Sequence, residues 1–132
     1  RKILFSRVVD IVKKNFIYKS MAELKEITDE NYEKEVMQSD SIWSVTFSAL
    51  SFCQPCKMLH PVLKEIAEKD KVPGVKFGTV ATENSGLNFS TSVGIRSVPT
   101  THIFHKGKIL GTQAGFVPEN EFISFVKKTA KV

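Results

Sequence analysis

The sequence has few of the residues that mark a cross-linked, fibrous or membrane-spanning protein. It contains only two cysteines among 132 residues, too few for a disulfide-rich secreted scaffold or a four-cysteine zinc site. Seven glycines and five prolines exclude a collagen-like or low-complexity chain. No apolar run exceeds three residues, so no membrane-spanning helix is predicted. The remaining composition, with 42% hydrophobic residues, is typical of one globular domain with a core of its own.

Positive charge is concentrated at the N-terminal end of the chain, whose formal net charge is +5. Of the 19 basic and 14 acidic side chains, six and one lie within residues 1–20, which leaves 13 of each sign in residues 21–132. The body of the protein is therefore neutral, and no nucleic-acid partner is predicted for it.

Apolar periodicity predicts strands that alternate with helices. Helices are expected at 3–17, from Thr28 or Asp29 to Gln38, after Cys53 with a kink at Pro61, at about 84–92 and from Pro118, and strands at 21–27, 42–49, 75–81, 100–105 and 108–114. This order predicts an α/β protein with a central mixed sheet flanked by helices. We divide the chain into a basic amphipathic extension, residues 1–20, and one domain, residues 21–132.

Both cysteines belong to Cys53-Gln54-Pro55-Cys56, which joins a predicted strand to a predicted helix. Free N–H groups and the dipole at the start of a helix favour a thiolate, so Cys53 is predicted to have a lowered pKa and to be the nucleophile. Cys56 lies one turn into the helix, where it can attack a mixed disulfide and release the product. Pro55 suits the first helical turn because that turn does not need its N–H.

Two other interpretations of the cysteine pair are weaker. The cysteines could be inert buried thiols, or they could bind a metal together with His60 in the pattern C-x2-C-x3-H. Zinc needs four ligands and the chain has no second cysteine pair, so no metal is predicted. His60 is instead interpreted as a surface residue beside the active site.

Three segments in order resemble the thioredoxin family, and the resemblance covers residues 21–131. They are FCQPCKMLHPVLKEIAE (52–68), GIRSVPT (94–100) and KGKILGTQAG (106–115). The resemblance implies a thioredoxin fold and a thiol–disulfide oxidoreductase that reduces protein disulfides. It implies no cofactor beyond a redox-active Cys53–Cys56 disulfide, and an electron donor such as a thioredoxin reductase.

The resemblance also implies a substrate groove beside the dithiol. Its residues would be Phe52, Gln54, Pro55, Val98, Pro99 and Gly115. The Val98–Pro99 peptide bond would be cis, and the Val98 backbone would pair with an extended substrate strand.

Four positions depart from the family pattern. Phe52 replaces the tryptophan before the first cysteine, and Gln54 replaces the glycine between the cysteines. The buried aspartate that accepts a proton from the second cysteine is replaced by Thr46 or Phe47, and its lysine partner by Gly78. Because general-base help is worth about 10²–10⁴-fold, we expect slower turnover than in a typical thioredoxin.

The alternative function is that of a thioredoxin-like binding or adaptor subunit of a folding or translocation assembly, with secondary redox activity. Residues 1–20 are open to three interpretations: a helix packed on the domain, the remnant of a targeting peptide, or a helix that docks on a membrane surface or a partner. The basic segment and the absence of an initial Met favour an organelle or the secretory pathway over the cytoplasm. A monomer is expected.

Overall fold

The computed structural model describes residues 22–132, and the helix predicted at 3–17 lies outside these residues. The elements are β1 (Leu24–Ile27), η1 (Glu33–Met37), β2 (Ile42–Ser48), α2 (Gln54–Glu68), β3 (Val75–Ala81), α3 (Leu87–Ser92), β4 (Thr100–His105), β5 (Lys108–Ala114) and α4 (Glu119–Ala130). The predicted alternation of strands and helices, with a closing hairpin, is confirmed.

The five strands form one mixed sheet in the order β1-β3-β2-β4-β5. Strands β1, β3 and β2 run parallel, whereas β4 is antiparallel to both β2 and β5. β2 and β3 are parallel, and their register pairs Ser48 with Ala81. The carboxyl ends of the two strands therefore lie side by side. The dithiol segment begins a few residues beyond Ser48, at that end of the sheet.

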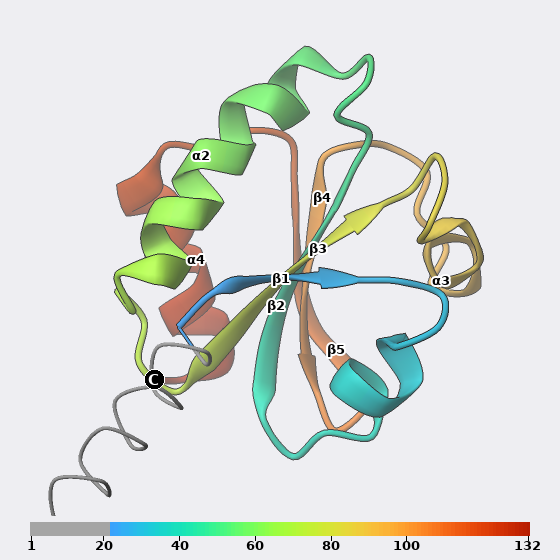
Figure 1. The fold of residues 1–132 in the computed structure, drawn as a ribbon. Coiled ribbons are helices and arrows are strands. Elements are labelled where there is room, and N and C mark those ends of the chain that lie inside the picture. The colour runs from blue at the N-terminus through green and yellow to red at the C-terminus, as the bar shows by residue number, and fades with distance from the viewer. Residues whose placement is uncertain (1–21) are drawn as a thin grey trace, which may run out of the picture.

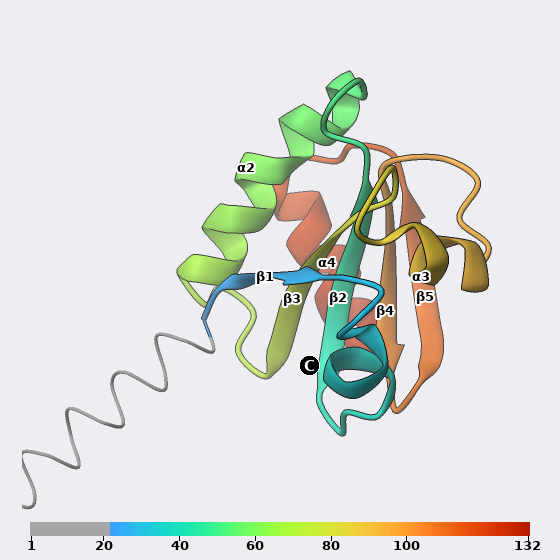
Figure 2. The same ribbon diagram turned by 45° about the vertical axis from the view of Figure 1, so that its right-hand side comes forward.

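Helices cover both faces of the sheet, α2 and α4 on one and η1 and α3 on the other (Figures 1 and 2). Each face has its own apolar core. One contains Leu63 of α2, Phe77 of β3 and Phe122 of α4. The other contains Phe47 of β2 and Phe89 of α3. Along a strand, side chains point alternately to the two faces of the sheet. The register therefore decides which residues of β2 and β3 lie beneath α2.

Several elements differ from their predicted bounds. β1 begins at Leu24 rather than at 21, β2 ends at Ser48 rather than at 49, and α3 begins at Leu87 rather than at about 84. The helix expected from Thr28 or Asp29 to Gln38 is a short π-helix, Glu33–Met37, in which Gln38 N–H bonds the carbonyl of Glu33 at 2.8 Å. The side chain of Asn31 accepts the N–H of Thr28 at 2.8 Å, and this local bond forms a turn where the longer helix was expected.

Pro118 was expected at the first helical position of the last helix, but it is the N-cap residue of α4, with an extended backbone (φ −63°, ψ 161°). Within residues 22–132, no helix combines the length and the apolar character that a membrane span would need.

Candidate functional site

The dithiol lies at the junction of β2 and α2, as the sequence predicts. Cys53 is the N-cap residue of α2 with an extended backbone, and its Sγ accepts the N–H of Cys56 at 3.2 Å. Pro55 lies in the first turn, where its missing N–H leaves no bond unmade. Cys53 and Cys56 form a disulfide with their Cα atoms 5.2 Å apart. The structure is therefore that of the oxidised protein.

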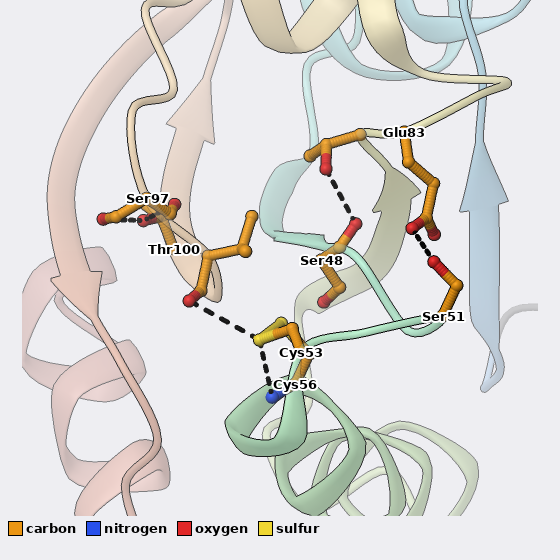
Figure 3. Close-up of a disulfide and its surroundings, with 9 residues drawn as sticks. Ser48, Ser51, Cys53, Cys56, Glu83, Ser97 and Thr100 are labelled. Carbon is orange, nitrogen blue, oxygen red and sulfur yellow. Dashed lines mark hydrogen bonds between the residues drawn. A yellow bond between two sulfur atoms is a disulfide. The ribbon is translucent and has the colours of Figure 1, made fainter.

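The two cysteines differ in access to solvent. Cys53 is 8% exposed and Cys56 is completely buried, although they are only three residues apart. Figure 3 shows both at the start of α2, with Ser51 and Glu83 to one side and the segment of Ser97 and Thr100 across from them. A substrate sulfur can therefore approach Cys53, while Cys56 can be reached only through its partner.

The loop before β4 closes the other side of the dithiol. The Val98–Pro99 peptide bond is cis, as predicted, and the carbonyl oxygen of Val98 lies 3.6 Å from Cys53 Sγ. The carbonyl of Pro99 accepts the N–H of Gly115 at 2.8 Å, and Gly115 has a φ of +80°, which favours glycine. Segments around residues 53, 98 and 115 thus meet at one point.

The residues next to Cys53 in the chain are exposed. Phe52 is 72% exposed, and Gln54 and Pro55 are also exposed. Val98 is partly buried and packs against the cysteines. Pro99 is buried, so its contribution to the predicted groove is to shape the loop rather than to offer surface.

A protein-family model described as Thioredoxin matches residues 23–128. The chain belongs to the thioredoxin family. Thioredoxin of Buchnera aphidicola subsp. Schizaphis graminum is 33% identical over 111 residues, which are 84% of this chain and 100% of that protein. Thioredoxin of Rickettsia felis is 36% identical over 105 residues, 78% of this chain and 95% of that one.

Solved structures agree with this assignment. The crystal structure of Malassezia sympodialis thioredoxin has a TM-score of 0.71 at 25% identity, covering 82% of this chain and 91% of that one. A mutant thioredoxin from Halobacterium salinarum has a TM-score of 0.72 at 20% identity and shows the fold alone. The fold is the thioredoxin fold.

Family and site together establish the chemistry. The protein is a thiol–disulfide oxidoreductase of the thioredoxin type, and its redox group is the Cys53–Cys56 disulfide rather than a separate cofactor. The comparisons do not favour the adaptor function. Among residues 22–132, no cluster of three or more His, Cys, Asp or Glu side chains is arranged to hold a metal ion.

Thr46 and Phe47, the two candidates for the aspartate position of the family pattern, lie on opposite faces of the sheet. Thr46 pairs with Thr79 of β3, on the sheet face under α2, while Phe47 belongs to the core of the opposite face. Thr46 is fully buried, and its Oγ1 lies 2.8 Å from Oγ1 of Thr101. Two hydroxyls bonded to each other therefore occupy this part of the core.

Gly78 does not lie beside Thr46, where the resemblance led us to look for the lysine position. A Cβ on Gly78 would meet Ile27 and Trp43 on the other face, and the neighbour of Thr46 in the register is Thr79. Thr79, the neighbour of Thr46 in the register, is neither acidic nor basic, so these two positions form no ion pair.

His60, interpreted from the sequence as a surface residue, is partly buried. Its Nδ1 is enclosed and has no hydrogen-bond partner among the described residues. Burial lowers the pKa of His60 below the ordinary value of 6.5, and the charge of Lys64 lowers it further. The ring lines a partly open cavity of about 390 Å³ that also includes Ser48, Glu26 and Glu83.

The sequence placed His60 beside the active site but gave no sign that its Nδ1 is enclosed. His60 follows Cys56 by four residues, the spacing that places two side chains on the same side of a helix. The bond between Ser51 Oγ and the carboxylate of Glu83 had no signal in the sequence, because it joins loops 32 residues apart.

Proposed function

We propose that this protein reduces disulfides in protein substrates, with Cys53 as the nucleophile and Cys56 as the resolving thiol. The observation that carries the proposal is the bond from Cys56 N–H to Cys53 Sγ at the N-terminus of α2. This N–H and the helix dipole stabilise negative charge on Cys53 once the disulfide is reduced. The complete burial of Cys56 supports the proposal that it is the resolving thiol.

The reaction transfers two electrons through a mixed disulfide. The Cys53 thiolate attacks one sulfur of the substrate disulfide, that S–S bond breaks, and the other substrate sulfur leaves as a thiolate and takes a proton from solvent. Cys56 then loses its proton and attacks Cys53 Sγ. The second substrate sulfur leaves, the substrate is reduced, and the Cys53–Cys56 disulfide is formed.

The surface proposed for substrate contact consists of Phe52, Gln54, Pro55, Val98 and Gly115, and buried Pro99 shapes the loop that carries Val98. Its support is the exposed ring of Phe52 and the carbonyl of Val98 beside Cys53 Sγ. An extended substrate segment that hydrogen-bonds the Val98 backbone would bring its own disulfide over Cys53.

The electron donor proposed is a dithiol–disulfide reductase such as a thioredoxin reductase, because the product of each turnover is the oxidised pair seen here. We also propose an organelle or the secretory pathway as the location, with residues 1–20 as a docking or targeting segment. The support is the excess of basic over acidic residues in that segment. The cytoplasm is the alternative location, and the monomeric state stays a prediction.

Cys56→Ser tests the assignment of the two thiols. We expect the reduced form of this variant to accumulate a mixed disulfide between Cys53 and a disulfide-containing protein such as insulin, because nothing resolves the intermediate. Turnover should fall to the uncatalysed rate. The measurement is a non-reducing gel together with an insulin reduction assay.

Cys53→Ser is the matched control and should form no mixed disulfide. Substrate association that survives in the Cys53→Ser, Cys56→Ser double variant would contradict the redox proposal and support the adaptor function.

A further inference from the structure

The resolving thiol is enclosed, and it must lose a proton before it can react. Cys56 is completely buried. Only the thiolate is nucleophilic, and burial opposes its formation. The first turn of α2 has no acidic residue, and the buried hydroxyls of Thr46 and Thr101 are bonded to each other. A proton acceptor for Cys56 has to be found elsewhere around α2.

We propose that His60 accepts the proton of Cys56 when Cys56 resolves the mixed disulfide. The inference rests on the proposed roles of the two cysteines. His60 lies one helical turn after Cys56 on α2. Side chains four residues apart on a helix are neighbours, and each leans toward the N-terminus, so the ring covers the turn that contains Cys56. Its enclosed Nδ1 has no hydrogen-bond partner among the described residues, and in the Nε2–H tautomer this nitrogen accepts a proton.

The surroundings keep the imidazole neutral and ready to accept a proton. Burial and the positive charge of Lys64 both lower the pKa of His60. Two carboxylates from other elements face the same cavity, Glu26 of β1 and Glu83 beyond β3. Glu83 is bonded to Ser51 Oγ, and Glu26 lies 3.4 Å from Ser85 Oγ. Neither carboxylate raises the pKa of His60 enough to offset burial.

The step balances within the reaction already described. The Cys56 S–H bond breaks, its proton passes to Nδ1 of His60, and the sulfur lone pair attacks Cys53 Sγ. The bond from Cys53 to the substrate sulfur breaks, and that sulfur leaves with the electron pair and takes up a proton. His60 then returns its proton to solvent through the cavity that it lines, which at about 390 Å³ has room for water.

A reagent that reports both steps separately tests the proposal. Reduced protein is mixed rapidly with 5,5′-dithiobis(2-nitrobenzoate), which releases one thionitrobenzoate when Cys53 attacks and a second when Cys56 resolves. We expect the resolving phase of the wild type to have an acid limb with its midpoint below 6.5, because only neutral His60 accepts a proton. His60→Ala should lose that limb and slow the resolving phase at neutral pH by about 10²-fold. The first phase should stay within about twofold.

Three further variants separate proton transfer from packing. His60→Asn keeps a polar side chain but cannot take up the proton, so it should behave as His60→Ala does. Lys64→Gln should move the midpoint of the acid limb to higher pH, because removing the positive charge raises the pKa of His60. His105→Ala is the matched histidine control, since His105 pairs with Ile42 at the far end of β2. It should leave both phases unchanged.

The proposal is overturned if His60→Ala retains the acid limb and the wild-type resolving rate. It is also overturned if Glu83→Gln removes the limb instead, or if His60→Asn restores the rate. A wild-type protein that shows no fast first phase would contradict the reactivity of Cys53, and with it the proposed function itself. A failure of the His60 proposal changes the expected second phase of thionitrobenzoate release, whereas a failure of the proposed function removes the first phase. One time course therefore distinguishes them.

Discussion

At the scale of single residues, two histidines show how burial tunes a titratable group. His60 lies at the cavity beside the dithiol, whereas His102 of β4 is 8% exposed within the sheet. Nδ1 of His102 lies 2.8 Å from Oγ1 of Thr112, and its ring meets the rings of Phe47 and Phe104 edge-on. Nε2 is enclosed without a partner among the described residues, and burial lowers the pKa of His102.

This burial predicts that the protein loses stability in mild acid. A pKa lower in the folded protein than in the unfolded chain means that the unfolded chain binds the proton more readily. Neutral, buried His102 makes its full contribution to the free energy of unfolding above the ordinary pKa of 6.5. This contribution is lost as the pH falls from there toward the lower pKa of His102 in the folded protein. The free energy of unfolding in urea, measured from about pH 8 to about pH 5, should therefore decrease.

His102→Gln is the variant that identifies the source of this decrease. It should flatten the pH dependence, leaving only the part that belongs to His60, whose pKa is lowered in the same direction. An equally steep decrease in the variant would mean that His102 does not contribute.

At the scale of elements, the short helix α3 depends on a residue from the segment after β1. The carboxylate of Asp29 accepts the N–H groups of Phe89 at 2.8 Å and Asn88 at 3.2 Å. The ring of Phe89 also stacks on Tyr32, with centroids 4.3 Å apart. A helix of six residues has little stability of its own, so these contacts hold it against the segment between β1 and η1.

Asp29→Ala should therefore destabilise the protein by about 1 kcal/mol, the usual effect of removing a side chain that caps free N–H groups. Chemical denaturation of the oxidised protein measures this change. Glu30→Ala, at the exposed neighbouring residue, is the matched control and should change the free energy of unfolding by less than about 0.5 kcal/mol. Equal effects of the two substitutions would argue against a cap.

At the scale of the whole molecule, chemistry and charge belong to different parts of the chain. Every residue proposed for catalysis or substrate contact lies between 52 and 115, and the family model spans residues 23–128. The net charge of +5 comes from residues 1–20. The remaining chain carries equal numbers of basic and acidic side chains and both apolar cores.

Deleting residues 1–20 should accordingly leave insulin reduction within about twofold of the full chain, since distant and independent parts contribute additively. The same deletion should move a fluorescently tagged chain from an organelle or the secretory pathway to the cytoplasm. An insulin reduction assay measures the turnover of the full chain and of the deletion variant, and fluorescence microscopy measures the location of each. Lost turnover would show that the segment supports the domain, and an unchanged location would contradict its targeting role.

Much of the fold and the centre of the site follow from the sequence alone. The bounds of β3, β4 and β5 were predicted to the residue, because strand periodicity and turn residues are local signals. The dithiol was equally clear, since C-x-x-C between a strand and a helix places Cys53 at the helix start whatever the rest of the chain does. The chain's own residues thus determined the type of reaction and the position of Cys53 at the helix start.

Tertiary structure decided what surrounds the dithiol. Only the strand register distinguishes Thr46 from Phe47 and places Thr79, rather than Gly78, beside it, because a shift of one residue moves a side chain to the other face. Only packing encloses Nδ1 of His60 and buries Pro99. The position of Cys53 at a helix start follows from neighbours in sequence. The burial of Cys56 and of Nδ1 of His60 depends on neighbours in space, which the chain acquires only when the sheet and helices assemble.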